Sequence, residues 1–339
     1  MIQAARALAA LAIVLHHALY EAVSLGGDGA RWAEAIQDAM PWEAGVDIFF
    51  VISGFVMAHA AGPLFGRGFD GARRFLAHRI ARIVPLYWAV TALYIVGSLA
   101  GPGPARRTIG GIGTILASFL FFPVARPGGP VMPVFGIGWT LNNEMFFYLL
   151  FAAVLWMQRT RGLLCLTLAL GGLVVRGWVV GLPGVAMAFW GSPIALEFLF
   201  GVWLYKAPRA PGGLVLGLMA VLGFWADVST FGVTRPLAWG LPALLLVAAA
   251  AGARDDEHAI WRTVAMRLGD ASYAIYLVHP FVMRALGLVW RTFGAAGPVS
   301  AFLFVGAVMT LSCLAATLVY RFGERPATRA LRRWLEPRS

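Results

Sequence analysis

The chain has 339 residues, of which 60% are apolar and only 13% charged. Soluble domains carry about 25% charged residues, so this composition excludes a water-soluble globular protein. The formal net charge of +11 comes from 27 lysine and arginine residues against 16 acidic ones. In a membrane protein such an excess gathers in cytosolic loops, so we expect it to reflect topology and not a nucleic-acid-binding surface.

Apolar runs of spanning length recur along the whole chain. A hydrocarbon core of about 30 Å needs about 20 apolar residues in a helix. We expect helices over residues 4–20, 43–61, 80–99, 138–157, 162–180, 185–205, 213–229, 236–252, 271–290 and 298–320. A shorter apolar piece near 109–122 is bounded by glycine and proline and is a candidate re-entrant segment. The predicted fold class is an all-α integral membrane protein of about ten transmembrane helices, forming a single domain over residues 1–339.

The charge distribution predicts the topology. Segments 62–82 and 321–338 are strongly basic, whereas the segment between the first two helices is acidic. Lysine and arginine favour the cytosolic side of a membrane. We therefore expect both termini in the cytosol and the acidic segment outside.

The first predicted helix carries an arginine and a histidine on one face. Arg6 and His17 are eleven residues apart, about 1100° of rotation, so they differ by about 20° in direction and lie about 16 Å apart along the axis. His16 points about 80° away from Arg6. Ionisable groups in a span are costly unless paired or hydrated. The pattern predicts a cavity with a cation near the cytosol and an imidazole in the outer half; the alternative is a histidine satisfied by a neighbouring helix.

The second predicted helix holds a carboxylate, Asp47, near its outer end. The same helix contains Ser53-Gly54, which close packing between helices explains as well as chemistry does. Asp47 is harder to explain by packing, because a charge in a span needs a partner or water.

The third predicted helix is preceded by a basic cluster on its cytosolic side. The cluster contains Arg73, Arg74, His78, Arg79 and Arg82. Arg79 and Arg82 are three residues apart and share a helical face. Guanidinium groups bind phosphate in a bidentate manner, so this cluster is suited to a donor that bears a nucleotide. On charge alone, binding of anionic lipid or simple anchoring by positive charge is the better explanation.

The fourth predicted helix places Glu144 about 9 Å below its outer boundary, a depth similar to that of His17. We expect Glu144 or Asp47 to orient His17, as the acid partner does in a catalytic triad. The alternative is a structural ion pair.

The ninth predicted helix, over residues 271–290, puts Ser272, Tyr276 and His279 on one stripe. Either chemistry or hydrogen bonding between helices explains this stripe.

Taken in order, these segments resemble the acyltransferase 3 family of membrane acyltransferases. The family pattern begins with an arginine followed after ten residues by a histidine, which Arg6 and His17 match. Residues 47–55, 79–87, 139–148, 272–280 and 324–326 resemble successive blocks of the family and extend the match over nearly the whole chain. Residues 138–148 are most similar to the branch that acetylates bacterial exopolysaccharides, although Asn143 replaces an expected aromatic residue.

The resemblance implies a multi-pass protein of the bacterial inner membrane that uses cytosolic acyl-CoA, in this branch acetyl-CoA. The acceptor implied is a hydroxyl of a surface or lipid-linked glycan. His17 becomes the catalytic residue, either as general base or as transient acyl carrier, with Glu144 or Asp47 as its partner. Expected donor-site residues are Arg6, Arg74, Arg79, Arg82 and Tyr87. Expected acceptor-site residues are Trp139, Asn142, Tyr148, Ser272, Tyr276 and His279.

We expect membrane lipids around the chain, and neither a metal nor a nucleic acid as a partner. A transporter or flippase for a glycan intermediate is the main alternative, since it also needs charges inside the membrane. The sequence shows no inverted repeat, and a phosphate-bearing donor accounts better for the cytosolic arginines. A scaffold subunit is a third alternative. For such a subunit, changes at the intramembrane charges alter stability without a separate catalytic defect.

Overall fold

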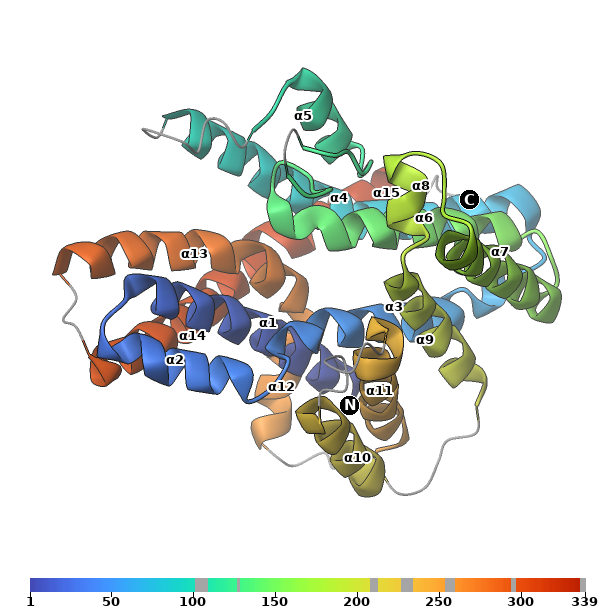
Figure 1. Ribbon diagram of the computed structural model, residues 1–339. Helices are drawn as coiled ribbons and strands as arrows, with labels where there is room; N and C mark the ends of the chain where they lie inside the picture. The colour runs from blue at the N-terminus through green and yellow to red at the C-terminus, as the bar shows by residue number, and fades with distance from the viewer. Residues whose placement is uncertain are drawn as a thin grey trace. The chain divides into compact units, whose positions relative to one another are not determined.

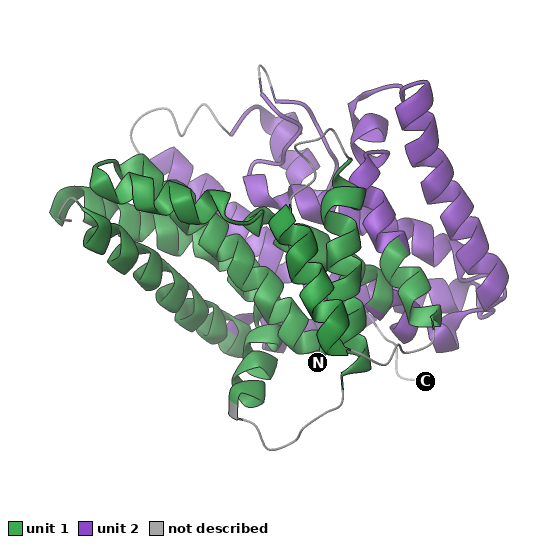
Figure 2. Ribbon diagram, turned by 60° about the horizontal axis from the view of Figure 1, so that its bottom comes forward, with its two compact units in different colours: residues 1–55, 200–322 green, residues 56–199, 323–339 purple. Residues whose placement is uncertain are grey.

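The computed structural model describes residues 1–100, 109–126, 129–207, 213–226, 234–253, 260–293 and 297–335 (Figure 1). Regular structure in these ranges is helical, and the only β pairing among them is an isolated bridge between Ala125 and Val131. The prediction of an all-α chain is confirmed. The chain divides into two compact units, residues 1–55 with 200–322 and residues 56–199 with 323–339 (Figure 2). The prediction of a single domain stays a prediction.

Unit 1 is built from two segments that are far apart in the chain. Its helices are α1 (Ile2–Leu25), α2 (Asp28–Asp38), η1 (Trp42–Ala44), most of α3 (Gly45–Ala60), the end of α9 (Leu196–Lys206), α10 (Gly213–Ala226), the π-helix η7 (Pro236–Gly240), α11 (Leu241–Gly252), α12 (Ile260–Asp270), α13 (Ser272–Phe293) and α14 (Pro298–Val319). Unit 2 contains the end of α3, η2 (Gly62–Leu64), α4 (Gly68–Ala100), α5 (Ile112–Phe119), η4 (Gly136–Gly138), α6 (Trp139–Val154), α7 (Arg159–Val179), α8 (Val185–Trp190), η5 (Pro193–Ala195), the start of α9 and α15 (Arg325–Leu335). The π-helix η8 (Tyr320–Glu324) crosses the boundary.

Helix α1 is the centre of unit 1, where it packs against α2, α11, α12, α13 and α14. Most of its buried residues are alanines, and glycines on two neighbouring elements allow still closer approach. A Cβ atom at Gly269 would meet the backbone oxygen of Gln3, and one at Gly45 would meet that of Ala9. Small residues at interfaces are how membrane helices gain packing energy without a hydrophobic driving force. The alanine-rich sequence of α1 thus lets many helices surround it.

Helix α4 is the longest helix of unit 2 and contacts both α6 and α15. Aromatic rings join the other elements: Phe75 of α4 stacks on Phe151 of α6 with centroids 5.2 Å apart, and Phe147 stacks on Phe198 at 4.4 Å. All four side chains are buried, and stacked aromatic pairs stabilise beyond the area that they bury. This aromatic core fixes α4 and α6 side by side.

Within the described ranges, six helical runs are long and apolar enough to cross a membrane: Ile2–Leu25, Trp42–Ala60, Gly68–Ala100, Arg159–Val179, Ser272–Phe293 and Pro298–Leu335. They coincide with six of the expected spans, and the shorter apolar helices Gly213–Ala226 and Pro236–Gly252 coincide with two more. Two expected spans remain. In 138–157 the helix α6 has only 16 residues, and the span 185–205 is interrupted between α8 and α9. Ten crossings and a re-entrant segment, where α5 now lies, stay predictions.

Three helices form where the sequence analysis expected none. These are α2, α12 and α15, which occupy the acidic segment, a predicted connection and the basic tail. Each is amphipathic, so an average over its residues hides the apolar face that holds it. For the same reason α4 begins at Gly68, not at residue 80: the arginine-rich cluster is itself helical.

Candidate active site

The polar side chains of α1 face α13 within unit 1. Nε and Nη2 of Arg6 donate to Oγ of Ser272 at 3.2 and 3.0 Å. Farther along both helices, the ring centroids of His17 and His279 are 5.1 Å apart. Arg6 and His17 therefore share the face of α1 that the eleven-residue spacing predicted. Ser272 and His279 are fully buried and lie on the facing stripe of α13.

The hydrogen bonds of the two imidazoles indicate which ring nitrogen carries the proton when the ring is neutral. Nδ1 of His17 lies 2.9 Å from the carbonyl oxygen of Ile13, and Nδ1 of His279 lies 3.2 Å from that of Ile275. A carbonyl only accepts, so in each neutral ring Nδ1 carries the proton and Nε2 keeps its lone pair. Nε2 of His279 is buried and has no hydrogen-bond partner in the described part of the chain. Two imidazoles, each with an unprotonated Nε2, thus lie side by side.

Tyr276 extends this cluster along α13. Its ring centroid lies 6.2 Å from that of His279 and 6.2 Å from that of Phe49 on α3. The residues predicted on one stripe of α13 are thus all buried at the interface with α1 and α3. An aromatic wall of this kind excludes water from the neighbouring imidazoles.

The neighbouring histidine, His16, points elsewhere. Its Nε2 lies 3.6 Å from Oε2 of Glu43, and its ring stands at 89° to that of His17 with centroids 5.2 Å apart. Of the two histidines, it is therefore His16 that has a carboxylate within ion-pair distance. His17 is oriented by a backbone carbonyl instead.

Asp47 forms a bidentate ion pair. Its fully buried carboxylate accepts from Nε of Arg235 at 3.0 Å and from Nη2 at 2.8 Å, and the guanidinium lies 4.6 Å from the ring centre of Trp239. Among the described residues no hydrogen bond joins Asp47 to His17. This geometry fits the structural-pair alternative, and a role for Asp47 beside His17 stays a prediction.

Sequence reasoning missed Arg235 because it precedes the apolar run 236–252 and was counted as a loop charge. A signal was available in principle: a carboxylate inside a span requires a cation, and an arginine at the end of another apolar run is a natural candidate.

A second polar cluster lies in unit 2, between α4, α6 and α15. Arg82 and Arg332 lie close enough to Arg79 to repel its charge, and Glu144 lies close enough to attract it. The hydroxyl of Tyr148 donates a short hydrogen bond to Glu144. The structure therefore places Glu144 with the arginines of unit 2. Its predicted role toward His17, which belongs to unit 1, stays a prediction.

The other predicted donor residues have different surroundings. Arg74 is exposed on α4, whereas Tyr87 is fully buried. A Cβ atom at Gly138 would come within 2.7 Å of the Tyr87 hydroxyl oxygen, so the tyrosine ring lies directly against the turn that precedes α6. Tyr87 thus supports the start of α6.

That start carries Trp139 and Asn142. The Asn142 side chain is 1% exposed, and neither Oδ1 nor Nδ2 has a hydrogen-bond partner in the structure described. Its backbone carbonyl accepts from the indole of Trp190, which stacks on Phe146 with centroids 4.6 Å apart. Buried amides are nearly always paired, so the Asn142 side chain is suited to a polar group that the described residues do not supply.

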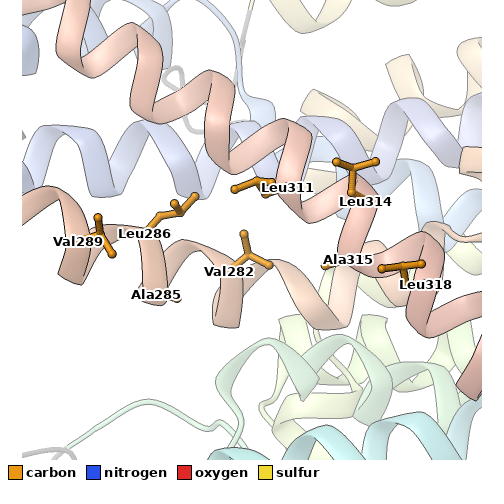
Figure 3. Close-up of a pocket in the computed structure, with 8 residues that line it drawn as sticks. All are labelled: Val282, Ala285, Leu286, Val289, Leu311, Leu314, Ala315 and Leu318. Carbon is orange, nitrogen blue, oxygen red and sulfur yellow. The ribbon is translucent and has the colours of Figure 1, made fainter.

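An apolar groove of about 440 Å³ lies between α13 and α14 (Figure 3). It is lined by Val282, Ala285, Leu286, Val289, Leu311, Leu314, Ala315 and Leu318. These aliphatic side chains offer no hydrogen bond or charge, so the groove has no chemistry of its own. In a membrane such a surface suits hydrocarbon chains.

Residues 2–320 match the model of the acyltransferase 3 family, described as an acyltransferase domain. The chain is 34% identical over 294 residues to the exopolysaccharide production protein ExoZ of Rhizobium meliloti (strain 1021), covering 84% of this chain and 89% of that protein. It is 28% identical over 331 residues to the acyltransferase MdmB of Streptomyces mycarofaciens, covering 85% and 81%. No solved structure matches the chain.

Proposed function

The chain belongs to the acyltransferase 3 family of membrane acyltransferases, and from that premise we propose that it transfers an acyl group, acetyl in the first instance, from cytosolic acyl-CoA to a hydroxyl of a surface or lipid-linked glycan of the exopolysaccharide type. The name of its relative from Rhizobium meliloti, an exopolysaccharide production protein, supports such an acceptor. We place the protein in the bacterial inner membrane with both termini in the cytosol.

The observation that carries the proposal is the state of His17. Its Nδ1–H is held by the carbonyl of Ile13, so Nε2 has a free lone pair beside the buried ring of His279. In the reaction, Nε2 takes the proton of the acceptor hydroxyl while the hydroxyl oxygen attacks the thioester carbonyl carbon. The carbon–sulfur bond then breaks, and the leaving thiolate takes the proton from the imidazolium. The products are the glycan ester and free CoA thiol.

A covalent route uses the same lone pair. Nε2 attacks the thioester carbonyl carbon and the carbon–sulfur bond breaks, which leaves an acyl-imidazolium and a thiolate. The acceptor hydroxyl then takes the acyl group, its proton passes to the thiolate, and the neutral imidazole is regenerated. Both routes need an imidazole held in one tautomer, which the Ile13 carbonyl supplies as a carboxylate does in a triad.

The remaining residues bind the two substrates. Arg79 and Arg82, with Arg74 at the exposed end of the cluster, are proposed to hold the phosphates of the donor, and Tyr87 supports the adjacent helix start. Arg6, whose guanidinium donates a hydrogen bond to Ser272, adds positive charge on the face of α1 that it shares with His17. For the acceptor, the unpartnered amide of Asn142 is suited to a sugar hydroxyl, because an amide both donates and accepts. Trp139, Tyr148 and Tyr276 supply aromatic surface and hydroxyl groups, and Nε2 of His279 supplies a second hydrogen-bond acceptor.

The test is release of free thiol from acetyl-CoA by purified protein in neutral detergent, with deacylated exopolysaccharide and no ion gradient. Acyl transfer predicts thiol release together with a matching mass increase of the glycan. A glycan transporter predicts neither. Absence of thiol release, combined with loss of glycan export in cells lacking the gene, would favour the transporter.

A further inference from the structure

The C-terminal helix α15 lies beyond the residues that match the family model, yet it packs on α4 within unit 2. The helix is rich in arginine, and its arginines are not equivalent. Arg333 is exposed, whereas Arg332 is partly covered and its Nε is buried. One of two adjacent identical side chains thus turns toward α4, and its neighbour faces solvent.

Helix α15 contacts α4, and three arginines of these two helices interact through their charges. Arg82 and Arg332 both act on the charge of Arg79, and all three carry the same sign. Such a cluster is repulsive, and Glu144 is the carboxylate that acts on the charge of Arg79. Nε of Arg79 and Nε of Arg332 are both buried and have no hydrogen-bond acceptor among the described residues. A buried cationic donor without an acceptor is costly, so this arrangement calls for an anion.

The N–H groups of the arginines indicate which kind of anion they bind. A guanidinium presents a planar fork of N–H groups that matches the oxygens of phosphate, and adjacent arginines suit an anion of more than one charge. A single carboxylate would neutralise only one of the three cations. Nucleotide phosphates and phospholipid headgroups share this phosphate chemistry.

We propose that Arg332 of α15 completes, with Arg79 and Arg82 of α4, one binding site for the phosphate groups of the acyl donor. This inference rests on the function proposed above and adds a residue outside the family-matched region. It gives the basic C-terminal tail a part in donor binding in addition to topology.

The experiment measures binding of coenzyme A to the purified full chain in neutral detergent. Arg332→Met keeps much of the side-chain bulk but removes the charge and the Nε donor, and Arg333→Met is the matched control on the exposed face. We expect Arg332→Met to raise the Kd for coenzyme A about tenfold to a hundredfold, as for a lost charge-assisted contact. Arg333→Met should change it less than about twofold. Arg79→Met, measured in parallel, should weaken binding as Arg332→Met does.

The outcomes separate the two levels of the argument. If Arg332→Met binds normally while Arg79→Met does not, the part assigned to α15 is overturned and the proposed function stands. If the unchanged chain neither binds coenzyme A nor releases thiol from acetyl-CoA, both are overturned. If Arg332→Met weakens binding of phosphatidylglycerol but not of coenzyme A, the site belongs to lipid and the inference fails.

A folding control completes the design. Should Arg332→Met lower the thermal midpoint more than Arg333→Met does, Arg332→Lys replaces it, because lysine keeps the charge and the stem but lacks the planar fork. The lysine variant should bind coenzyme A more weakly than the unchanged chain. Equal affinity would overturn the guanidinium contact.

Discussion

At the scale of single residues, the two adjacent histidines of α1 have the same chemistry and different surroundings. His17 lies beside His279 with Nε2 available, whereas His16 lies beside Glu43. We expect His17→Ala to lower acyl transfer by at least about 10²-fold to 10⁴-fold, the usual contribution of a general base, with donor binding retained. His16→Ala should keep most of the activity. A transfer assay that finds His17→Ala active would remove His17 from the reaction.

The Asp47–Arg235 pair separates a structural role from a catalytic one. Replacing Arg235 by alanine leaves a fully buried carboxylate without its bidentate partner, so we expect destabilisation of about 3–5 kcal/mol. The double variant Asp47→Asn with Arg235→Gln should recover much of that loss, because no uncompensated charge remains. Thermal unfolding in detergent measures both. A double variant that is stable but inactive would restore Asp47 as a partner in the reaction.

How far the site could be predicted also depends on single residues. The eleven-residue spacing of Arg6 and His17 and the stripe of Ser272 and His279 follow from helical periodicity, which a sequence displays directly. Arg235 and Arg332 could not be found in that way. Their partners lie on other helices far along the chain, and no local pattern states which helices will pack together.

At the scale of elements, the sequence predicted the long apolar helices and missed the amphipathic ones. The window of about 20 residues that finds a spanning helix averages over both faces of α2, α12 and α15. The same window also merges α8, η5 and α9 into one run, although Gly191 separates α8 from η5 and Pro193 begins η5. Average hydropathy therefore locates the long apolar helices but does not detect the amphipathic ones.

Helix packing gives a prediction at this scale. A Cβ atom at Gly201 of α9 would meet the backbone oxygen of Val51 on α3, and backbone cannot yield as a side chain can. Gly201→Ala should therefore destabilise the protein by about 1–3 kcal/mol. At Gly172 of α7 nothing lies within 4 Å, so Gly172→Ala should be neutral or stabilising by up to about 1 kcal/mol. Equal thermal midpoints for the two variants would contradict this packing.

At the scale of the whole molecule, the charge distribution predicts which side of the membrane each segment faces. Glu34 on α2 and Arg73 on α4 are both exposed, so a cysteine at either position is accessible. In a background where Cys165 and Cys313 are alanine, a cysteine at 34 should react with an impermeant thiol reagent in intact cells, and one at 73 only after permeabilisation. A reporter fused after Ser339 should be cytosolic. Labelling of both cysteines from one side would contradict the topology with ten crossings.

The assembly of unit 1 from two segments far apart in the chain has a consequence for biogenesis. Arg6 is separated from its partner Ser272 by 266 residues, and at about 5–20 residues per second a ribosome needs about 13–53 s to cover that distance. During this interval α1 lies in the bilayer while its arginine and histidine have no contact with α13, which has not yet been synthesised. Insertion chaperones, lipid headgroups or water must satisfy those side chains first. A nascent chain arrested before α13 should therefore be a preferred substrate for membrane quality-control proteases.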